Sequence, residues 1–324
     1  MQRIQIIQLT NTLFTVRLYL CCLFLLLVSG FLFCQETQPK ERVYKYSLEL
    51  RHDNDFPVFT DRYYTTGNFI GWRTKLNPGK DSTEQKQYNL FVVQQLYTPA
   101  DIIETDIKKF DRPFAGFLGL SNGLTITNTR RLIDVNVLIG VSGPPSGGAA
   151  IQEAFHSAPA VSSRIPTWLG QLRTSAFGNI YSTYTREWQW EPNPFSVHFA
   201  LSPSAALGNK DIYGQQEAAF FFGRRSSLQK TSAYQQIGDP EKEFFFAVRV
   251  AYRYIFHDAM QEGDFIGDAS PFLIKPHRNR FIYNFEMNGR IKRHNFMVAY
   301  NYATPENRRA FPHLYVTFSI TRAF

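Results

Sequence analysis

The segment from residue 244 to residue 256 alternates between two kinds of side chain, and this alternation restricts the fold more than any other feature. One face carries Phe244, Phe246, Val248, Val250, Tyr252, Tyr254 and Phe256. The other face carries Phe245, Ala247, Arg249, Ala251, Arg253 and Ile255. A period of two is that of a β-strand, and this strand is longer than the about 5–6 residues usual in soluble sheets. Aromatic residues on one side and arginines on the other predict a strand between lipid and water.

The first 35 residues have the composition of an export signal. A lead that contains Arg3 and Arg17 and no acidic residue is followed by an apolar run over residues 18–34. We predict that residues 1–35 are a secretory signal peptide and that residues 36–324 form one mature domain. A single transmembrane anchor is the alternative, because about 17–25 apolar residues can span a bilayer.

The positions of the cysteines and the net charge restrict the metal sites, disulfides and binding partners that the mature chain can have. All three cysteines, Cys21, Cys22 and Cys34, lie in the predicted signal, so the mature chain has no disulfide framework and no thiolate metal site. Lipidation of Cys34 is disfavoured, because the bulky Phe33 precedes it. The formal charge of +8 falls to +6 without the signal, and the basic residues are scattered along the chain. This surplus favours anionic lipid head groups over nucleic acid as a partner.

The mature chain has the features of an outer-membrane barrel. Past residue 34 no apolar run is long enough for a membrane helix, and aromatic residues make up 16% of the sequence. An exported chain of this kind can span lipid only by closing a β-barrel, in which every backbone group is paired. We therefore predict an all-β, transmembrane, antiparallel β-barrel in the bacterial outer membrane. We expect about twelve strands, at residues 43–53, 63–76, 87–98, 114–128, 131–142, 175–189, 195–208, 212–225, 243–257, 280–292, 294–304 and 314–324.

The even strand number assigns each connection to one side of the membrane. With both termini in the periplasm, the odd connections face outward, and most of them are long, as this fold expects. The turns at 77–80, 128–130 and 191–194 are short and face inward. Connection 226–242 does not fit, because it is long yet assigned to the periplasm, so either the count slips there or the turn is unusual.

Reactive residue types gather in the first three outward connections, in blocks at residues 51–55, 61–67, 111–116 and 140–156. The last block includes a stretch, AAIQEAFHS, that we expect to form a short helix in an extracellular loop, ending near His156. Barrel closure would bring these blocks to one rim. A histidine can act there as general base on water, carboxylate and carbonyl oxygens suit calcium, and the cation with an amide donor can stabilise an oxyanion.

Each block also has a structural interpretation. Residues 53–55 are typical of a turn, and the Asp-Arg pairs at 61–62 and 111–112 are typical of ion pairs at a rim. The glycines of 140–148 let a loop bend. The other histidines have no setting comparable to that of His156; they are His52, His198, His257, His277, His294 and His313.

The ordered set HDNDFPVFTDRYYTTG, DRPFAGF, GVSGPPSGGAAIQEAFH and PTWLGQL resembles the outer-membrane lipid A 3′-O-deacylase family. The resemblance covers about residues 43–190, and the rest of the chain is similar only as a barrel. It implies a twelve-stranded barrel, calcium dependence, and an active site at the extracellular end between the wall and a loop helix. It also implies hydrolysis of the 3′-linked acyloxyacyl ester of lipid A.

The resemblance also implies residue roles. The family's catalytic histidine corresponds to His156, its Asn-Asp pair to Asn54 and Asp55, and its hydroxyl residue to Thr65. His156 would activate water, Asn54 and calcium would steady the oxyanion, and Asp55 would hold the metal or orient the site. Asp53 is a second candidate calcium ligand. An acyl-enzyme formed through Thr65 is disfavoured, because the family resemblance implies direct attack by water.

The second outward connection contains the residues that the resemblance assigns to substrate binding, and the segment after the histidine departs from the family. The family's basic pair that meets lipid A phosphate corresponds loosely to Lys108 and Lys109, and Arg112 is a further candidate for binding substrate. The acidic residue expected soon after the histidine is replaced by Ala160-Val161-Ser162-Ser163. We expect a monomer in the outer membrane that acts on lipopolysaccharide. The alternatives are a non-enzymatic pore or structural barrel, and a phospholipid acyl hydrolase.

Overall fold

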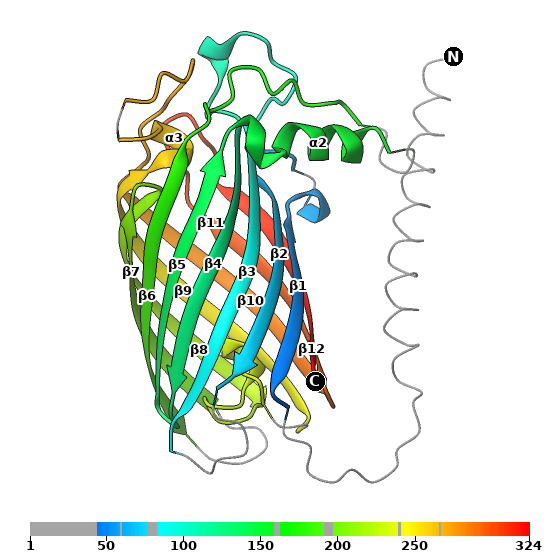
Figure 1. Cartoon of the computed structure of the whole chain (residues 1–324), viewed down its shortest axis with the longest axis vertical. Helices are drawn as coiled ribbons and strands as arrows, with labels where there is room; N and C mark the ends of the chain where they lie inside the picture. The colour runs from blue at the N-terminus through cyan, green and yellow to red at the C-terminus, as the bar shows by residue number, and fades with distance from the viewer. Residues whose placement is uncertain are drawn as a thin grey trace.

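The computed structural model describes residues 44–58, 60–76, 83–158, 163–190, 197–238, 241–265 and 267–324. In these ranges twelve strands form a closed antiparallel barrel, in which β1 pairs with β12 and each other pair of neighbours is consecutive (Figure 1). The predicted fold class is confirmed. The signal segment 1–35 and the turns 77–80 and 191–194 lie outside the described residues.

The strands start and end within three residues of the predicted positions. They are β1 (Tyr46–Asn54), β2 (Tyr63–Lys75), β3 (Gln85–Thr98), β4 (Ala115–Thr127), β5 (Arg131–Ser142), β6 (Ala176–Trp190), β7 (Val197–Gly208), β8 (Asp211–Arg224), β9 (Glu243–Asp258), β10 (Asn279–Ile291), β11 (His294–Ala303) and β12 (His313–Ala323).

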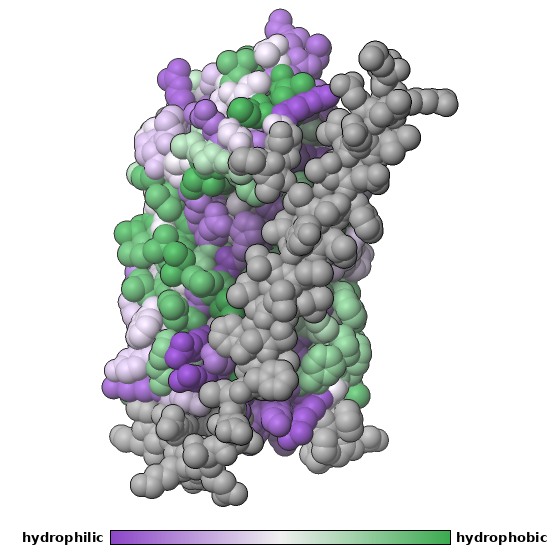
Figure 2. Space-filling view, turned by 90° about the vertical axis from the view of Figure 1, so that its right-hand side faces the viewer, coloured by the Kyte–Doolittle hydropathy of each residue, from purple (hydrophilic) through white to green (hydrophobic). Residues whose placement is uncertain are grey.

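The two faces of β9 lie as their alternation predicts. Phe244 and Phe256 are more than half exposed on the outer wall, whereas Phe245 and Ala247 are fully buried on the lumen side. Exposed aromatic and aliphatic side chains recur on the outer face of the other strands. Figure 2 shows them as green regions along the side of the molecule, with hydrophilic residues toward both the upper and the lower end. The outer surface thus suits contact with the acyl chains of a bilayer.

The long connections and α2 (Gly148–His156) lie at the end of the barrel away from the C-terminus, which is the extracellular end (Figure 1). The predicted loop helix is therefore confirmed. The second helix, α3 (Ala259–Glu262), follows β9 at the same end. Within the described part of the chain, no helix is both long and apolar enough to cross a membrane.

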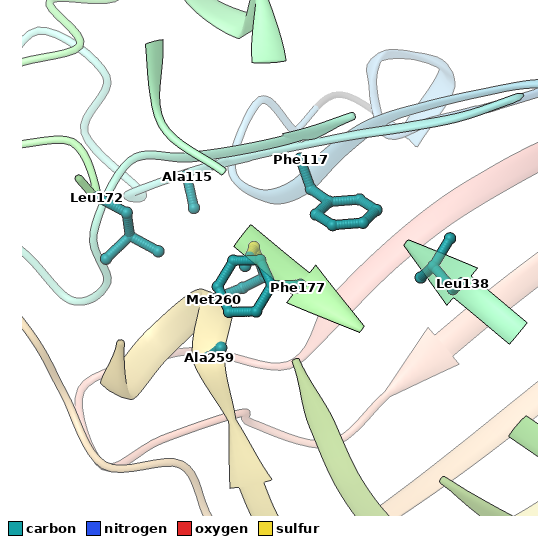
Figure 3. Packing of buried hydrophobic residues seen from close by; sticks show 7 residues of the cluster. All are labelled: Ala115, Phe117, Leu138, Leu172, Phe177, Ala259 and Met260. Atoms are coloured by element: carbon teal, nitrogen blue, oxygen red, sulfur yellow. The ribbon is translucent and has the colours of Figure 1, made fainter. Parts of the chain in front are cut away.

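A hydrophobic cluster fills the lumen at the extracellular end. It joins strand residues to residues of the outward connections, and comprises Ala115, Phe117, Leu138, Leu172, Phe177, Ala259 and Met260 (Figure 3). Phe117 and Ala115 are fully buried, and Met260 of α3 is 1% exposed. This cluster fixes the outward connections on the barrel, which gives the rim a defined shape.

The long inward connection after β8 folds into the barrel and obstructs its periplasmic end. It includes η4 (Ser232–Tyr234), and its Leu228 and Ile237 are buried. The side chain of Gln87 bonds it twice: Nε2 donates to the carbonyl of Gln235 (3.3 Å) and Oε1 accepts from the amide of Ile237 (3.1 Å). The strand count was therefore correct, and the turn is the unusual element.

Several charged residues in the lumen are paired with one another. Arg249 bonds Glu286 at 2.7 Å and Glu217 at 2.9 Å, and Arg225 bonds both carboxylate oxygens of Glu187 at 2.8 and 2.9 Å. Pairing of this kind is required, because an unpartnered charge at a buried position costs several kcal/mol. Between these pairs and the obstructing connection lies a polar cavity of about 370 Å³.

The outer face of β9 gives a test of the membrane assignment. Replacing the outward Val248 by Arg should destabilise the folded barrel by about 2–4 kcal/mol in lipid, because arginine near the middle of the bilayer is poorly solvated. Equilibrium urea unfolding in lipid vesicles measures the change. Val248→Leu is the matched control and should stay within about 1 kcal/mol of wild type. Equal stability of the Arg variant would refute the assignment of this face to lipid.

Candidate active site

The helix α2 is seated on the barrel by its glycines. Gly147 has φ +71°, a left-handed conformation that favours glycine, and it lies directly before the helix. At Gly148 an added Cβ would lie 2.6 Å from the ring of Trp168 and 2.8 Å from Leu96, so only glycine permits this approach of helix and wall. The block GVSGPPSGG therefore does more than let the loop bend.

One face of α2 is turned toward the protein and the other toward the surroundings. Gln152 and His156, four residues apart, are 3% and 4% exposed. Ile151 and Phe155 are about two-fifths exposed. Residues four apart share a helix face, so the helix presents polar groups to the barrel and an apolar edge outward.

A cavity of about 470 Å³ lies between α2 and the extracellular ends of β1 and β2. It is lined by His52, Asn54, Asp55, Phe56, Thr60, Asp61, Thr65, Thr66, Asn68, Ile151, Gln152, Phe155, His156 and Ser163. Asn54 pairs with Thr66 in the register of β1 and β2, and both side chains are on the outer face of the strands. The cavity thus adjoins the outer wall of the barrel, the side on which membrane lipid lies.

His156 is held between two oxygen groups. Its Nδ1 is 2.7 Å from the hydroxyl of Ser163, and its Nε2 is 3.5 Å from a carboxylate oxygen of Asp61. Ser163 belongs to the stretch that replaces the acidic residue expected after the histidine. The carboxylate beside the imidazole therefore comes from the first outward connection, and a serine comes from the third.

Two carboxylates meet at one hydroxyl group. Thr65 Oγ1 is 3.0 Å from Asp55 Oδ1 and 3.1 Å from Asp61 Oδ1. A threonine hydroxyl has one proton and can donate to only one of them. Asp55 has two further donors on its other oxygen, the hydroxyl of Thr60 (2.9 Å) and the amide of Arg62 (2.8 Å). One of the two carboxylate oxygens beside Thr65 therefore receives no proton from that hydroxyl, and it can bind a further proton or a cation.

The pKa values reflect this crowding. The pKa of Asp55 is raised from 3.8 to about 7, mainly by burial and also by the neighbouring Asp61, against the hydrogen bonds from Arg62, Thr60 and Thr65. Burial also raises the pKa of Asp61, although the nearby His156 opposes this shift. Perturbed carboxyl groups in a cavity are typical of functional sites.

The donor set is oxygen-rich. Within the described ranges, no group of three or more His, Cys, Asp or Glu side chains is arranged to hold a metal. Two carboxylates with a threonine hydroxyl, and with peptide carbonyls or water, are the ligand types of a hard cation such as calcium. The carboxylate oxygen to which Thr65 does not donate is the group in this structure that fits such a cation.

Asn54 lies in the cavity wall with a free amide group. Its Oδ1 accepts from the amide of Phe56 at 2.7 Å, so the turn expected from the sequence is present. Its Nδ2 has no hydrogen-bond partner among the described residues. The same side chain therefore closes a turn and offers a donor to the cavity.

Asp53 lies apart from this group. Its side chain is on the lumen side, where it accepts from the hydroxyl of Tyr64 at 2.7 Å and lies 3.7 Å from Arg51. Strand alternation places it on the face opposite Asn54. Asp53 does not line the cavity, and we therefore do not retain it as a calcium ligand.

The three basic residues expected to bind substrate do not lie together. Lys108 and Lys109 line a separate groove of about 550 Å³ with Arg309, and Lys109 lies 3.2 Å from Glu104. Arg112 is 1% exposed and bonds Glu306 at 2.7 Å. Arg112 cannot meet a substrate from this position, so its assignment to binding is corrected to a structural ion pair.

Sequence reasoning missed Asp61 and Ser163. Asp61 was interpreted as half of an ion pair with Arg62, but its carboxylate faces His156 and Thr65 instead. No local pattern marks this role, because Asp61 and His156 are 95 positions apart. Ser163 was noted only as part of a replacement for an acid.

Comparison with known proteins agrees with the fold. Residues 18–324 match the model of a family described as Outer membrane protein LpxR. The structure is similar to that of LpxR from Salmonella typhimurium, with a TM-score of 0.72 and 19% identity over 86% of this chain and 100% of that chain. The β-domain of the Bordetella autotransporter BrkA matches with a TM-score of 0.41 and 11% identity over 87% of this chain and 99% of that chain. No curated protein sequence matches.

The raised pKa of Asp55 predicts a pH-dependent effect on stability. The folded state favours protonated Asp55, so its stabilising contribution is complete below about pH 4 and is lost as the pH rises through about 7. In Asp55→Asn this side chain stays neutral at every pH. With chelator present, the free energy of unfolding of the variant should therefore exceed that of wild type by up to about 4 kcal/mol at pH 8. The difference should shrink toward pH 4. Urea unfolding in detergent across this pH range measures it, and a difference independent of pH would contradict the assignment.

Proposed function

Since the chain belongs to the LpxR family of outer-membrane proteins, we propose that it is a lipid A deacylase that hydrolyses the 3′-linked acyloxyacyl ester of lipopolysaccharide. The substrate lies in the outer leaflet, and we propose that the enzyme acts as a monomer. Carboxylic ester hydrolysis is the chemistry that the residues of the cavity support best.

The convergence of His156, Asp61, Asp55 and Thr65 in one cavity beside the outer wall carries this proposal. A histidine next to carboxylates supplies a base, and Asn54 supplies an unpartnered amide donor. The apolar edge of α2 borders the same cavity. An ester at the base of a membrane-embedded acyl chain can reach such a site without leaving the bilayer.

His156 is the proposed general base. When His156 donates a hydrogen bond from Nδ1–H to Ser163, its Nε2 is unprotonated and can accept a proton from water. The water oxygen attacks the acyl carbon, the bond from that carbon to the sugar oxygen breaks, and the proton passes from Nε2 to the leaving alkoxide. The products are a free fatty acid and a sugar hydroxyl. Asp61 lies 3.5 Å from the same Nε2, so its negative charge stabilises the imidazolium electrostatically between these two transfers.

The oxyanion formed by this attack needs donors. Asn54 Nδ2 is the side-chain amide available in the cavity wall. We propose that calcium binds Asp55 and Asp61 with Thr65, and that it supplies Lewis-acid stabilisation of negative charge when bound. Thr65 holds the two carboxylates in position and does not act as a nucleophile.

Lys108 and Lys109 are proposed to bind the phosphate of lipid A. Lys109 is 65% exposed and pairs with Glu104, and Arg309 lines the same groove together with the acidic Asp101 and Asp111. The two lysines are therefore open to a phosphate at the extracellular rim, next to carboxylates that offset part of their charge. Lysine acts as a point charge toward phosphate and steers anionic substrates at low salt. This groove supplies affinity, whereas the cavity under α2 supplies the chemistry.

Replacing His156 by Ala should lower lipid A deacylation by about 10²–10⁴-fold, the usual contribution of a positioned base. Mass spectrometry of lipid A after incubation with detergent-purified protein measures the lost acyl group. Heat-modifiable migration should stay normal, which shows an intact barrel. His294→Ala, at the periplasmic end, is the matched control and should keep full activity. Undiminished turnover of the His156 variant would exclude this mechanism.

Removal of calcium should abolish activity, and its return should restore it. Isothermal titration gives a second readout that does not need turnover: Asp55→Asn and Asp61→Asn should each weaken calcium binding about tenfold or more, because each removes a charged ligand. Lys109→Ala is the control and should bind calcium as wild type does. Full activity after exhaustive chelation would remove the metal from the mechanism.

A further inference from the structure

Two arginines face each other on the outer wall of the barrel, near its periplasmic end. Arg131 opens β5 and is the register partner of Arg186, which lies near the end of β6. The next outward pair in the same register is Ile133 and Tyr184, which are 45% and 39% exposed on the lipid side. Because side chains two positions apart share a face of a strand, both arginines also point outward, one step nearer the periplasm.

The charge of this pair is not balanced by the described part of the protein. Arg131 is exposed and Arg186 is half-buried, and no carboxylate in the described ranges forms an ion pair with either of them. Arg130, in the turn before β5, likewise has no ion pair among the described residues. Glu187 follows Arg186 in sequence, but it is buried on the lumen side, where Arg225 bonds both of its oxygens. Like charges directly opposite each other destabilise a sheet, so an anion bound between the two arginines would relieve this cost.

The aromatic residues around the pair indicate its depth in the membrane. The guanidinium carbon of Arg186 lies 5.9 Å from the centre of the Trp188 ring. Trp188 and Trp190 both stack on Phe199, with their ring centres 5.8 and 6.2 Å from that of Phe199, and the two tryptophans are 40% and 52% exposed. Tryptophans of membrane proteins gather at the interface, at the level of the lipid head groups. The pair therefore lies where the apolar wall meets the head groups of the leaflet on the periplasmic side.

We propose that Arg131 and Arg186 bind the phosphate of an anionic glycerophospholipid in the inner leaflet of the outer membrane. A guanidinium presents its N–H groups as a planar fork that matches two phosphate oxygens, and two opposed guanidiniums can hold one phosphate between them. The acyl chains of such a lipid lie along the apolar wall at Ile133 and Tyr184. A free phosphate ion fits the same guanidiniums but lacks these chains, so the lipid binds more tightly. The site is at the opposite end of the barrel from α2, and it does not depend on the proposed hydrolysis.

Native mass spectrometry of the full barrel in a maltoside detergent, titrated with phosphatidylglycerol, tests this. Arg131→Gln and Arg186→Gln should each weaken binding by about tenfold or more, the factor expected when one hydrogen bond to a charged group is lost. The Arg131→Lys, Arg186→Lys double variant keeps the charge without the forks, so its affinity should lie between those of wild type and of the corresponding double Gln variant. Arg308→Gln is the matched control and should bind as wild type does, because it removes an exposed arginine at the extracellular rim.

Stability separates loss of binding from loss of folding. Without lipid, urea unfolding of Arg186→Gln in the same detergent should have a midpoint no lower than that of wild type, because the substitution removes the repulsion between the two arginines. Added phosphatidylglycerol should raise the midpoint of wild type and leave that of the Arg131→Gln, Arg186→Gln double variant unchanged, because a ligand stabilises only the form that binds it.

Phosphatidylcholine and inorganic phosphate, titrated in the same way, test the charge of the head group and the need for acyl chains. Both should bind wild type more weakly than phosphatidylglycerol does. Equal affinity for either of them would overturn the assignment to an anionic lipid. Unchanged phosphatidylglycerol binding in both single Gln variants, or an equal loss in Arg308→Gln, would overturn the role of the arginine pair.

Discussion

Closure of the sheet is the constraint on which the rest of the structure depends. In lipid, a backbone N–H or C=O without a partner costs several kcal/mol, so β1 must meet β12, and it does so over eight register pairs from Ser47 to Asn54. Closure fixes an inside and an outside for every strand residue. It also gathers the odd-numbered connections at one end, where segments far apart in sequence share a rim.

The inside of the barrel follows from the same constraint. Half of each strand faces inward, and between the hydrophobic clusters the sequence fills many of those positions with charged and polar groups. Arg249 with Glu217 and Glu286, and Glu187 with Arg225, are paired because an unpartnered charge there would be costly. The inward connection after β8 fills the periplasmic end and the cluster around Phe117 fills the other. The lumen is thus packed from both sides, and the candidate chemistry lies beside the wall.

The site gathers groups that would repel one another elsewhere. Asp55 and Asp61 both lie within hydrogen-bond distance of Thr65, whose hydroxyl can donate to only one of them, and burial raises the pKa of both carboxyls. A fold selected for stability alone would not retain this arrangement, and such local cost is typical of a functional site. On the lipid-facing wall, hydrogen bonds join His52, Asn68 and Gln94, and these bonds lower the cost of placing polar side chains there.

The sequence by itself determined the barrel, its strand number, the side of each connection and the helix that ends at His156. These properties depend on a period of two and on local glycine and loop patterns, which neighbouring residues carry. Only the tertiary structure decided which polar residues meet. Arg112 is buried against Glu306, and Asp61 reaches an imidazole 95 positions away. Such contacts depend on closure and on the seating of α2, and no local pattern encodes them.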